Sequence, residues 1–249
     1  MSDRDSALNT NTADRLFFVG GGSLLTRAVL TVQDLGFKHT TVYCPVDDPC
    51  IPKLRKLNVE ITQTHDPSTD ILRNLEHRNK NIILSINNKH VFSDEVLSCS
   101  ASFFNIHNGL VQNYRGISEV CVFAALVQGA KEYGVTLHRI LPNQKVDTGP
   151  IIAQEAFPIS AHDTFFDVMQ KSMHHTIKIF DLNIKKLIAN NFETTVCKYE
   201  ATALKYEDIP SLLNASTADI LIKARSMGYY EPYFQKLANL IDKRCLSKR

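Results

Sequence analysis

Three polar side chains in this 249-residue sequence could act together on one carbonyl group. Asn105 and His107 stand two residues apart at the end of an apolar run, and alternate residues of a strand point to the same face. Asp147 lies in the turn-like segment Val-Asp-Thr-Gly-Pro, just before another apolar stretch. We expect this turn to bring Asp147 back onto the face that carries the other two.

An amide donor and an imidazole aimed at one point suit acyl transfer, in which a carbonyl oxygen becomes negative. A carboxylate beside the imidazole would keep it protonated or relay a proton. The set contains no nucleophile, so the attacking group would come from the substrate. Asn, His and Asp near strand ends are more often capping or hydrogen-bonding groups, and spacing alone does not choose between these interpretations.

Four short motifs surround these residues in a fixed order, namely Asn105-x-His107, Tyr-Arg-Gly at 114–116, Gly-Val-Thr at 134–136 and Val-Asp-Thr-Gly at 146–149. With these motifs in this order, the sequence resembles the folate-dependent formyltransferases over most of residues 15–190. That family includes methionyl-tRNA formyltransferase, glycinamide ribonucleotide transformylase and the sugar-nucleotide N-formyltransferases. The resemblance implies that Asn105, His107 and Asp147 form the catalytic triad.

The resemblance also implies N10-formyltetrahydrofolate as the co-substrate and a primary amine as the acceptor. The loop that receives the pterin ring in the family corresponds here to Asn87, Asn88, Lys89, His90, Val91 and Phe92. One departure follows His107, where the family's His-Pro-Ser-Leu-Leu-Pro is His-Asn-Gly-Leu-Val-Gln. Both prolines and the serine are absent from this loop, although the triad residues are all present.

A glycine-rich turn, Gly20-Gly21-Gly22-Ser23, follows an apolar strand and precedes a helical pattern. Backbone amides at such a turn can bind phosphate, and the resembling transformylase holds its substrate phosphate there. We therefore expect Gly21, Gly22, Ser23 and Arg115 to contact a phosphorylated or nucleotide-linked acceptor. The alternatives are a turn that needs glycine only for its backbone and an exposed, solvated Arg115. A dinucleotide site is disfavoured because Leu25 replaces the third glycine of that fingerprint.

The elements that must position these residues alternate between apolar strand-like runs and helical patterns. This alternation predicts an α/β fold with a Rossmann-like, mainly parallel sheet, helices on both faces and a small C-terminal appendage. We expect a disordered leader at 1–14, a catalytic domain at 15–190 and a small tail domain at 191–249. Strands are expected at 16–19, 40–44, 59–62, 82–86, 134–141, 151–159 and 193–199, and helices at 24–32, 52–57, 68–77, 116–129 and 166–187.

Three local features refine this picture. The apolar spacing in 116–129 predicts an amphipathic helix that faces the sheet. The segment Ser-Ala-His-Asp at 160–163 predicts a capping box for the helix that follows. His138, in the expected strand at 134–141, is interpreted as a packed strand histidine rather than a second catalyst.

Composition excludes several other functions. The 28 basic and 26 acidic residues leave a net charge of only +2, so we expect neither nucleic acid nor a membrane as partner. The sequence contains no long apolar run or signal-like start, which predicts a cytoplasmic protein. A homodimer is a separate expectation. Six scattered cysteines without zinc-ligand spacing, and the adjacent His174 and His175 that a helix would aim apart, predict no metal.

The acceptor amine is less constrained than the reaction. The C-terminal tail is short for a tRNA-binding barrel, so the most favoured acceptor is a nucleotide-linked amino sugar. Glycinamide ribonucleotide comes second and a hydroxyornithine-type amine third. A formyltetrahydrofolate deformylase, an aspartic protease built on Asp147-Thr148-Gly149 and a non-catalytic folate-binding module are further alternatives. The protease is disfavoured because its chemistry requires two carboxylates and the tripeptide occurs once.

Overall fold

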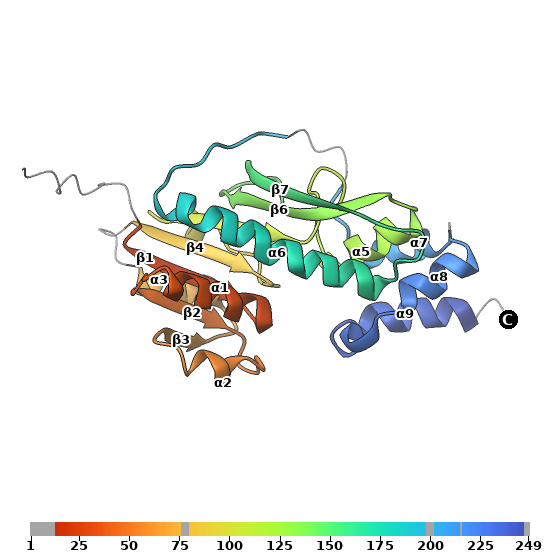
Figure 1. The fold of residues 1–249 in the computed structure, drawn as a ribbon, viewed down its shortest axis with the longest axis horizontal. Helices are drawn as coiled ribbons and strands as arrows, with labels where there is room; N and C mark the ends of the chain where they lie inside the picture. The colour runs from red at the N-terminus through yellow and green to blue at the C-terminus, as the bar shows by residue number, and fades with distance from the viewer. Residues whose placement is uncertain (1–12, 76–79, 198–201, 215, 247–249) are drawn as a thin grey trace, which may run out of the picture. The chain divides into compact units, whose positions relative to one another are not determined.

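The computed structural model describes residues 13–75, 80–197, 202–214 and 216–246 (Figure 1). Its strands form one seven-stranded sheet in the order β3-β2-β1-β4-β5-β6-β7, in which β5 comprises Ser102–His107. The predicted mainly parallel α/β sheet with a C-terminal helical appendage is thereby confirmed. Most of the expected leader lies outside the described residues. The chain divides into two compact units, which are considered separately below.

The first unit contains the residues up to Phe103 together with Asp181–Glu193. Parallel strands join β2 to β1, β1 to β4 and β2 to β3. The side chains of β1, β2 and β4 are almost all buried, which is why these segments read as continuous apolar runs rather than as alternating patterns. The four strands are β1 (Arg15–Gly20), β2 (Thr40–Cys44), β3 (Glu60–Gln63) and β4 (Asn81–Ile86).

Helices connect these strands. In α1 the buried side chains Leu25, Val29 and Val32 recur at helical spacing, as predicted. The helix α3 starts where the Asp66 side chain accepts the Thr69 amide and ends at Asn74, earlier than expected. The helices of this unit are α1 (Gly22–Asp34), α2 (Ile51–Leu54), α3 (Pro67–Asn74) and α4 (Asp94–Leu97).

The second unit contains Phe104–Phe180 and Thr194–Arg249. An antiparallel ribbon, β6 (Glu132–Ile140) with β7 (Ile151–Pro158), has a register shift between Leu137 and His138. The long helix α6 (Phe165–Ile188) begins in this unit. The expected strand at 193–199 is reduced to a single bridge from Thr195 to Ile151, and residues 198–199 lie outside the described part of the chain.

The helix α5 (Ser118–Val127) differs from its prediction. All of its residues from Glu119 to Val127 are buried, so it is a core helix and not an amphipathic one. The reason lies in the C-terminal helices α7 (Ile209–Asn214) and α8 (Ala218–Arg225), which pack against it (Figure 1). The remaining elements are the short helices η1 (Tyr206–Asp208) and η2 (Gly228–Tyr233), and α9 (Gln235–Leu246).

The predicted capping box at 160–163 lies one turn too early. Ser160 and Asp163 do bond to each other, but they close a turn before the helix. The capping box of α6 is formed by Thr164 and Asp167, since each side chain accepts the other residue's amide. Among the described residues, no helix combines the length and apolarity needed to cross a membrane.

Candidate active site

The strand β5 places Asn105 and His107 on one face, where both meet the same carboxylate. Asn105 Nδ2 lies 3.4 Å from Asp147 Oδ1, and His107 Nδ1 lies 3.4 Å from Asp147 Oδ2. His107 and Asp147 are buried, whereas Asn105 is partly exposed. The structure therefore brings together the three residues that sequence spacing singled out, and leaves Asn105 as the member that a ligand can reach.

Asp147 is held in place by the main chain. It occupies a turn in the left-handed region, with φ of 56°, a conformation that Asp tolerates better than most residues. The amide of Gly116 donates to Asp147 Oδ2 at 2.9 Å. This bond ties the carboxylate to the segment that precedes α5, and a bond to a backbone amide favours its charged form.

His107 is enclosed on its other side by the loop that follows it. Its Nε2 lies 3.0 Å from the carbonyl oxygen of Tyr114, and a carbonyl can only accept, so Nε2 carries a hydrogen. A Cβ on Gly109 would lie 2.3 Å from that oxygen and 2.8 Å from His107 Nε2. The glycine that replaces the family's serine is therefore required by this tight loop. Both ring nitrogens of His107 therefore contact groups of the protein itself. The prediction had been that the ring points at an atom of a bound ligand.

The ionisation of the pair follows from burial and contact. Burial by itself raises the pKa of Asp147, but the nearby His107 and His138 and the Gly116 amide outweigh it and hold the pKa well below its usual range. The pKa of His107 is lowered by burial and by the nearby His138, and the Asp147 carboxylate and the Tyr114 carbonyl oppose this shift without cancelling it. Asp147 is thus the contact that favours a charged His107.

His138 is a member of this cluster that the sequence interpretation did not select. It is 2% exposed, and its Nε2 lies 3.2 Å from Asn105 Nδ2 and 3.5 Å from Asp147 Oδ1. The register shift in β6 immediately precedes it, and such bulges commonly redirect a side chain. Spacing within the strand gave no signal for it, because the register shift interrupts the alternation that would relate its side chain to the rest of β6.

The alternative interpretation of Arg115 as an exposed, solvated side chain is wrong, and its predicted contact with the acceptor stays a prediction. Arg115 is only 6% exposed, because its segment is covered by the C-terminal part of the chain. Leu204 donates its amide to the Arg115 carbonyl at 2.7 Å and accepts the Ile117 amide at 3.0 Å. These bonds fix the backbone on both sides of Gly116, whose amide reaches Asp147.

The glycine-rich turn in the first unit carries a carboxylate of the protein itself. Asp48 Oδ2 accepts the Gly22 amide at 2.7 Å, and Asp48 Oδ1 accepts the Cys50 amide at 2.8 Å. A Cβ on Gly21 would lie 2.1 Å from Asp48 Oδ2, so this approach requires glycine. The helix-start amide that was expected to meet a phosphate is therefore bonded to Asp48, and Ser23 beside it is exposed.

The loop expected to receive the pterin ring, 87–92, is braced by its own side chains. Asn88 bonds to both the amide and the carbonyl of His90, and Ser68 Oγ lies 2.8 Å from His90 Nε2. Phe92 is buried against Phe103, with ring centroids 5.3 Å apart. Alternate residues are exposed as a result, namely Asn87, Lys89 and Val91. A braced loop with three exposed residues is compatible with a flat heterocyclic ligand.

Comparison with known proteins assigns the family. A sequence profile described as "Formyl transferase" matches residues 45–182, more than half of the 249 residues. This protein belongs to the formyl transferase family. The match includes all four members of the cluster, Asn105, His107, His138 and Asp147.

Solved structures share the fold of this formyl transferase family member at low sequence identity. A sugar 3N-formyl transferase, WlaRD, was solved with dTDP and 5-N-formyl-THF. It has a TM-score of 0.67 at 22% sequence identity, and the match covers 78% of this chain and 70% of the WlaRD chain. An N-formyltransferase from Helicobacter canadensis was solved with folinic acid and dTDP-3-aminofucose. It has a TM-score of 0.66 at 20% sequence identity, and the match covers 78% of this chain and 71% of the other. Glycinamide ribonucleotide transformylase 1 from Symbiobacterium toebii has a TM-score of 0.63 at 18% sequence identity. The match covers 80% of this chain and 100% of the other.

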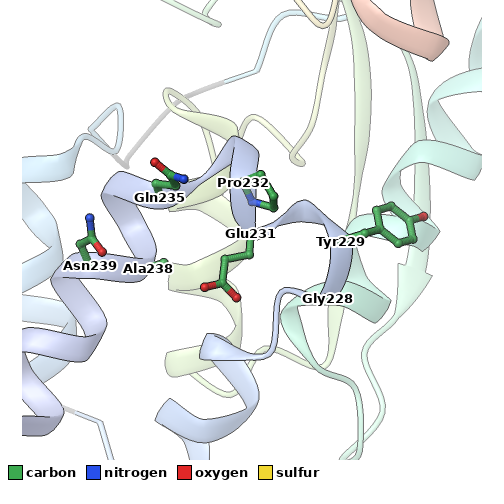
Figure 2. Close-up of a pocket in the computed structure, with 7 residues that line it drawn as sticks. All are labelled: Gly228, Tyr229, Glu231, Pro232, Gln235, Ala238 and Asn239. Carbon is green, nitrogen blue, oxygen red and sulfur yellow. The ribbon is translucent and has the colours of Figure 1, made fainter. Parts of the chain in front are cut away.

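A separate hollow of about 590 Å³ lies in the C-terminal part of this formyl transferase family member (Figure 2). Gln235, Ala238 and Asn239 of α9 line one side, and Tyr229 points its ring away from them. Glu231 at its wall is paired with Arg225. None of the residues proposed for catalysis lines this hollow. Within the described part of the chain, no group of three or more His, Cys, Asp or Glu residues could hold a metal ion.

Proposed function

We propose that this protein transfers the formyl group of N10-formyltetrahydrofolate to the primary amine of a nucleotide-linked amino sugar. The observation that carries this proposal is the convergence of Asn105, His107 and Asp147 in a member of the formyl transferase family. An amide donor, an imidazole and a carboxylate without a nucleophile of their own suit a reaction in which the acceptor supplies the attacking atom.

When bound, N10-formyltetrahydrofolate supplies a formyl carbon to which the neutral amine of the acceptor bonds while the bond to N10 breaks. Asn105, the partly exposed member, donates an N–H to the formyl oxygen as that oxygen becomes negative. His107 donates from its ring after exchanging its bond to the Tyr114 carbonyl. Asp147 orients His107, favours its charged form and relays the amine proton through water to N10 of the leaving tetrahydrofolate.

The loop 87–92 is the segment we assign to the pterin ring. Its support is the exposure of Asn87, Lys89 and Val91 on a loop that the Asn88 side chain braces. Two fold neighbours were solved with 5-N-formyl-THF or folinic acid, which agrees with this co-substrate. The proposal of a homodimer and a cytoplasmic location stays a prediction from the sequence.

The choice of acceptor rests on the fold neighbours, because two of them were solved with dTDP or a dTDP-linked amino sugar. The glycine-rich turn does not separate the candidates. Any phosphate at Gly22, whether a monoester or the diphosphate of a nucleotide sugar, would have to displace the Asp48 carboxylate, which has the same sign of charge. Glycinamide ribonucleotide is the second candidate, because the transformylase neighbour is covered along its whole length. Contacts from Gly21, Gly22, Ser23 and Arg115 to the acceptor stay predictions.

The test is an acceptor screen. The purified protein is incubated with N10-formyltetrahydrofolate and a panel of amines, and tetrahydrofolate release and the formylated product are followed together. We expect nucleotide-linked amino sugars to give the highest kcat/KM. Preference for glycinamide ribonucleotide would overturn the acceptor. Release of tetrahydrofolate and formate without any amine would identify a deformylase, and binding without turnover would contradict the catalytic assignment.

A further inference from the structure

The hydrogen bonds of His138 fix which of its nitrogens carries a hydrogen. Its Nδ1 lies 2.9 Å from the carbonyl oxygen of Arg139, which can only accept. In the neutral ring, Nδ1 therefore carries the hydrogen and Nε2 presents a lone pair. The strand β6 thus presents His138 Nε2 to Asn105 as an acceptor, and the bond from His138 Nδ1 to the Arg139 carbonyl fixes the ring.

That lone pair determines how the Asn105 side chain lies. The Asn105 nitrogen is 3.2 Å from His138 Nε2 and 3.4 Å from Asp147 Oδ1, and with the His138 ring neutral both of these atoms accept. If the amide were turned over, its oxygen would face two other acceptors, an arrangement without a hydrogen bond. Two acceptors on neighbouring segments therefore select the orientation with the nitrogen inward.

We propose that His138 is a positioning residue that holds the Asn105 amide with one N–H on His138 Nε2, so that the other N–H can serve the reacting oxygen. His138 is buried and its Nε2 faces Asn105, so it acts through Asn105 rather than on the substrate. The kinetic part of this inference rests on the proposed formyl transfer, whereas the tautomer does not.

The structure suggests which substitutions separate this role from simple packing. His138→Leu fills the space but removes the acceptor, and His138→Gln keeps an oxygen that can accept from Asn105. We expect His138→Leu to lower kcat by about tenfold to a hundredfold with little change in KM, because a misplaced donor costs mainly in the transition state. His138→Gln should recover part of this loss. The exposed His162 supplies the control, and His162→Gln should be unchanged.

A double-mutant cycle with Asn105 is the decisive kinetic measurement. If His138 works through Asn105, then His138→Leu should change kcat less than about twofold in an Asn105→Ala background. The proposal would be overturned if the double variant lost kcat by the product of the two single losses, or if the His138→Leu enzyme were as active as the wild type.

Nitrogen NMR of the histidine side chains supplies a readout besides activity. In the wild-type protein, the His138 signals should show a protonated Nδ1 and a bare Nε2. A protonated Nε2 would contradict the proposal even if formyl transfer were confirmed. If no acceptor is formylated, the proposed function fails, and this measurement still tests how His138 holds Asn105. It also remains decisive if the His138→Leu protein does not fold.

Discussion

Asp147 contacts all the other members of the candidate site through its carboxylate. It contacts His107 with one oxygen and lies near Asn105 and His138 with the other, while the Gly116 amide anchors it. The nearby His107 and His138 and the Gly116 amide explain why its pKa is held low in spite of burial. In return Asp147 favours the charged form of His107 against the effect of burial, and its removal should show in the pH dependence of the rate.

Asp147→Asn should lower kcat and also move the high-pH limb of the pH–rate profile to lower pH. The sign follows because Asp147 is the largest influence that raises the pKa of His107, so its loss lets burial and the nearby His138 lower that pKa further. The measurement is a pH–rate series with saturating co-substrate on both enzymes. Gln144→Ala, an exposed change in the same connection between β6 and β7, is the control. An unshifted limb would show that Asp147 does not act through His107.

At the scale of single residues, the sequence predicted site residues correctly where the alternation of strand side chains and the motifs agreed. Asn105 and His107 share a face because strand residues alternate, and Asp147 was placed by its turn residues. His138 was not selected, since a buried strand looks the same in sequence whether its polar residue packs or takes part in a site. The exposure of Arg115 could not be predicted either, because the cover comes from residues about ninety positions further on, near Leu204.

At the scale of elements, the short segment around Leu204 supports the site from a distance in the sequence. It bridges to Gly116 as an isolated parallel pair, and the Tyr206 hydroxyl donates to the buried Glu119 at 2.6 Å. The C-terminal helices then bury α5 on the same side. The tail thus contributes to the position of the Gly116 amide, and through it to Asp147.

Leu204→Pro should reduce activity more than Leu204→Ala. Proline removes the amide that bonds to Arg115, whereas alanine keeps both main-chain bonds and loses only side-chain packing. A lost bond of this kind costs about 1–3 kcal/mol, which urea unfolding would detect. Equal kcat values for the two folded variants would show that the bridge does not position the site.

The helix α1 supplies a second test at this scale. Its N-cap, Gly21, has no side chain to bond the first turn, and Asp48 provides the acceptor from another segment. Asp48→Ala should therefore lower the free energy of unfolding by about 1 kcal/mol, whereas the neighbouring exposed Asp47→Ala should not. Thermal and urea unfolding of both variants would measure this difference, and equal stabilities would contradict the capping role.

At the scale of the whole molecule, the alternation of strands and helices was sufficient to predict the sheet. The element types were recovered because buried parallel strands and helices differ in length and period. The amphipathic interpretation of α5 was wrong because a helix covered on both sides leaves no polar face. The boundary expected at residue 190 stays a prediction, since the chain also divides into two units that each combine separate segments.

The stability of the folded protein should fall in acid because of the buried cluster. The pKa of Asp147 is lower in the folded than in the unfolded chain, so the unfolded chain binds more protons as the pH falls. Its contribution is present above about pH 4 and is lost below it. The lowered pKa of His107 acts in the same direction, starting from about pH 6.5. Urea unfolding between pH 3 and 7 should show a shallower decline for Asp147→Asn than for wild type, and parallel curves would contradict this account.

The central claim is that Asn105, His107 and Asp147 carry out formyl transfer, and the most direct test is single-turnover transfer with the preferred amine. Asn105→Ala, His107→Ala and Gln144→Ala are compared with the wild-type protein, each with N10-formyltetrahydrofolate in excess. Losing one donor to the developing oxyanion typically costs about a hundred- to a thousandfold in rate, so the first two variants should fall by that factor while Gln144→Ala keeps the wild-type rate. Near-normal transfer by folded Asn105→Ala and His107→Ala proteins would contradict the assignment of this cluster as the active site.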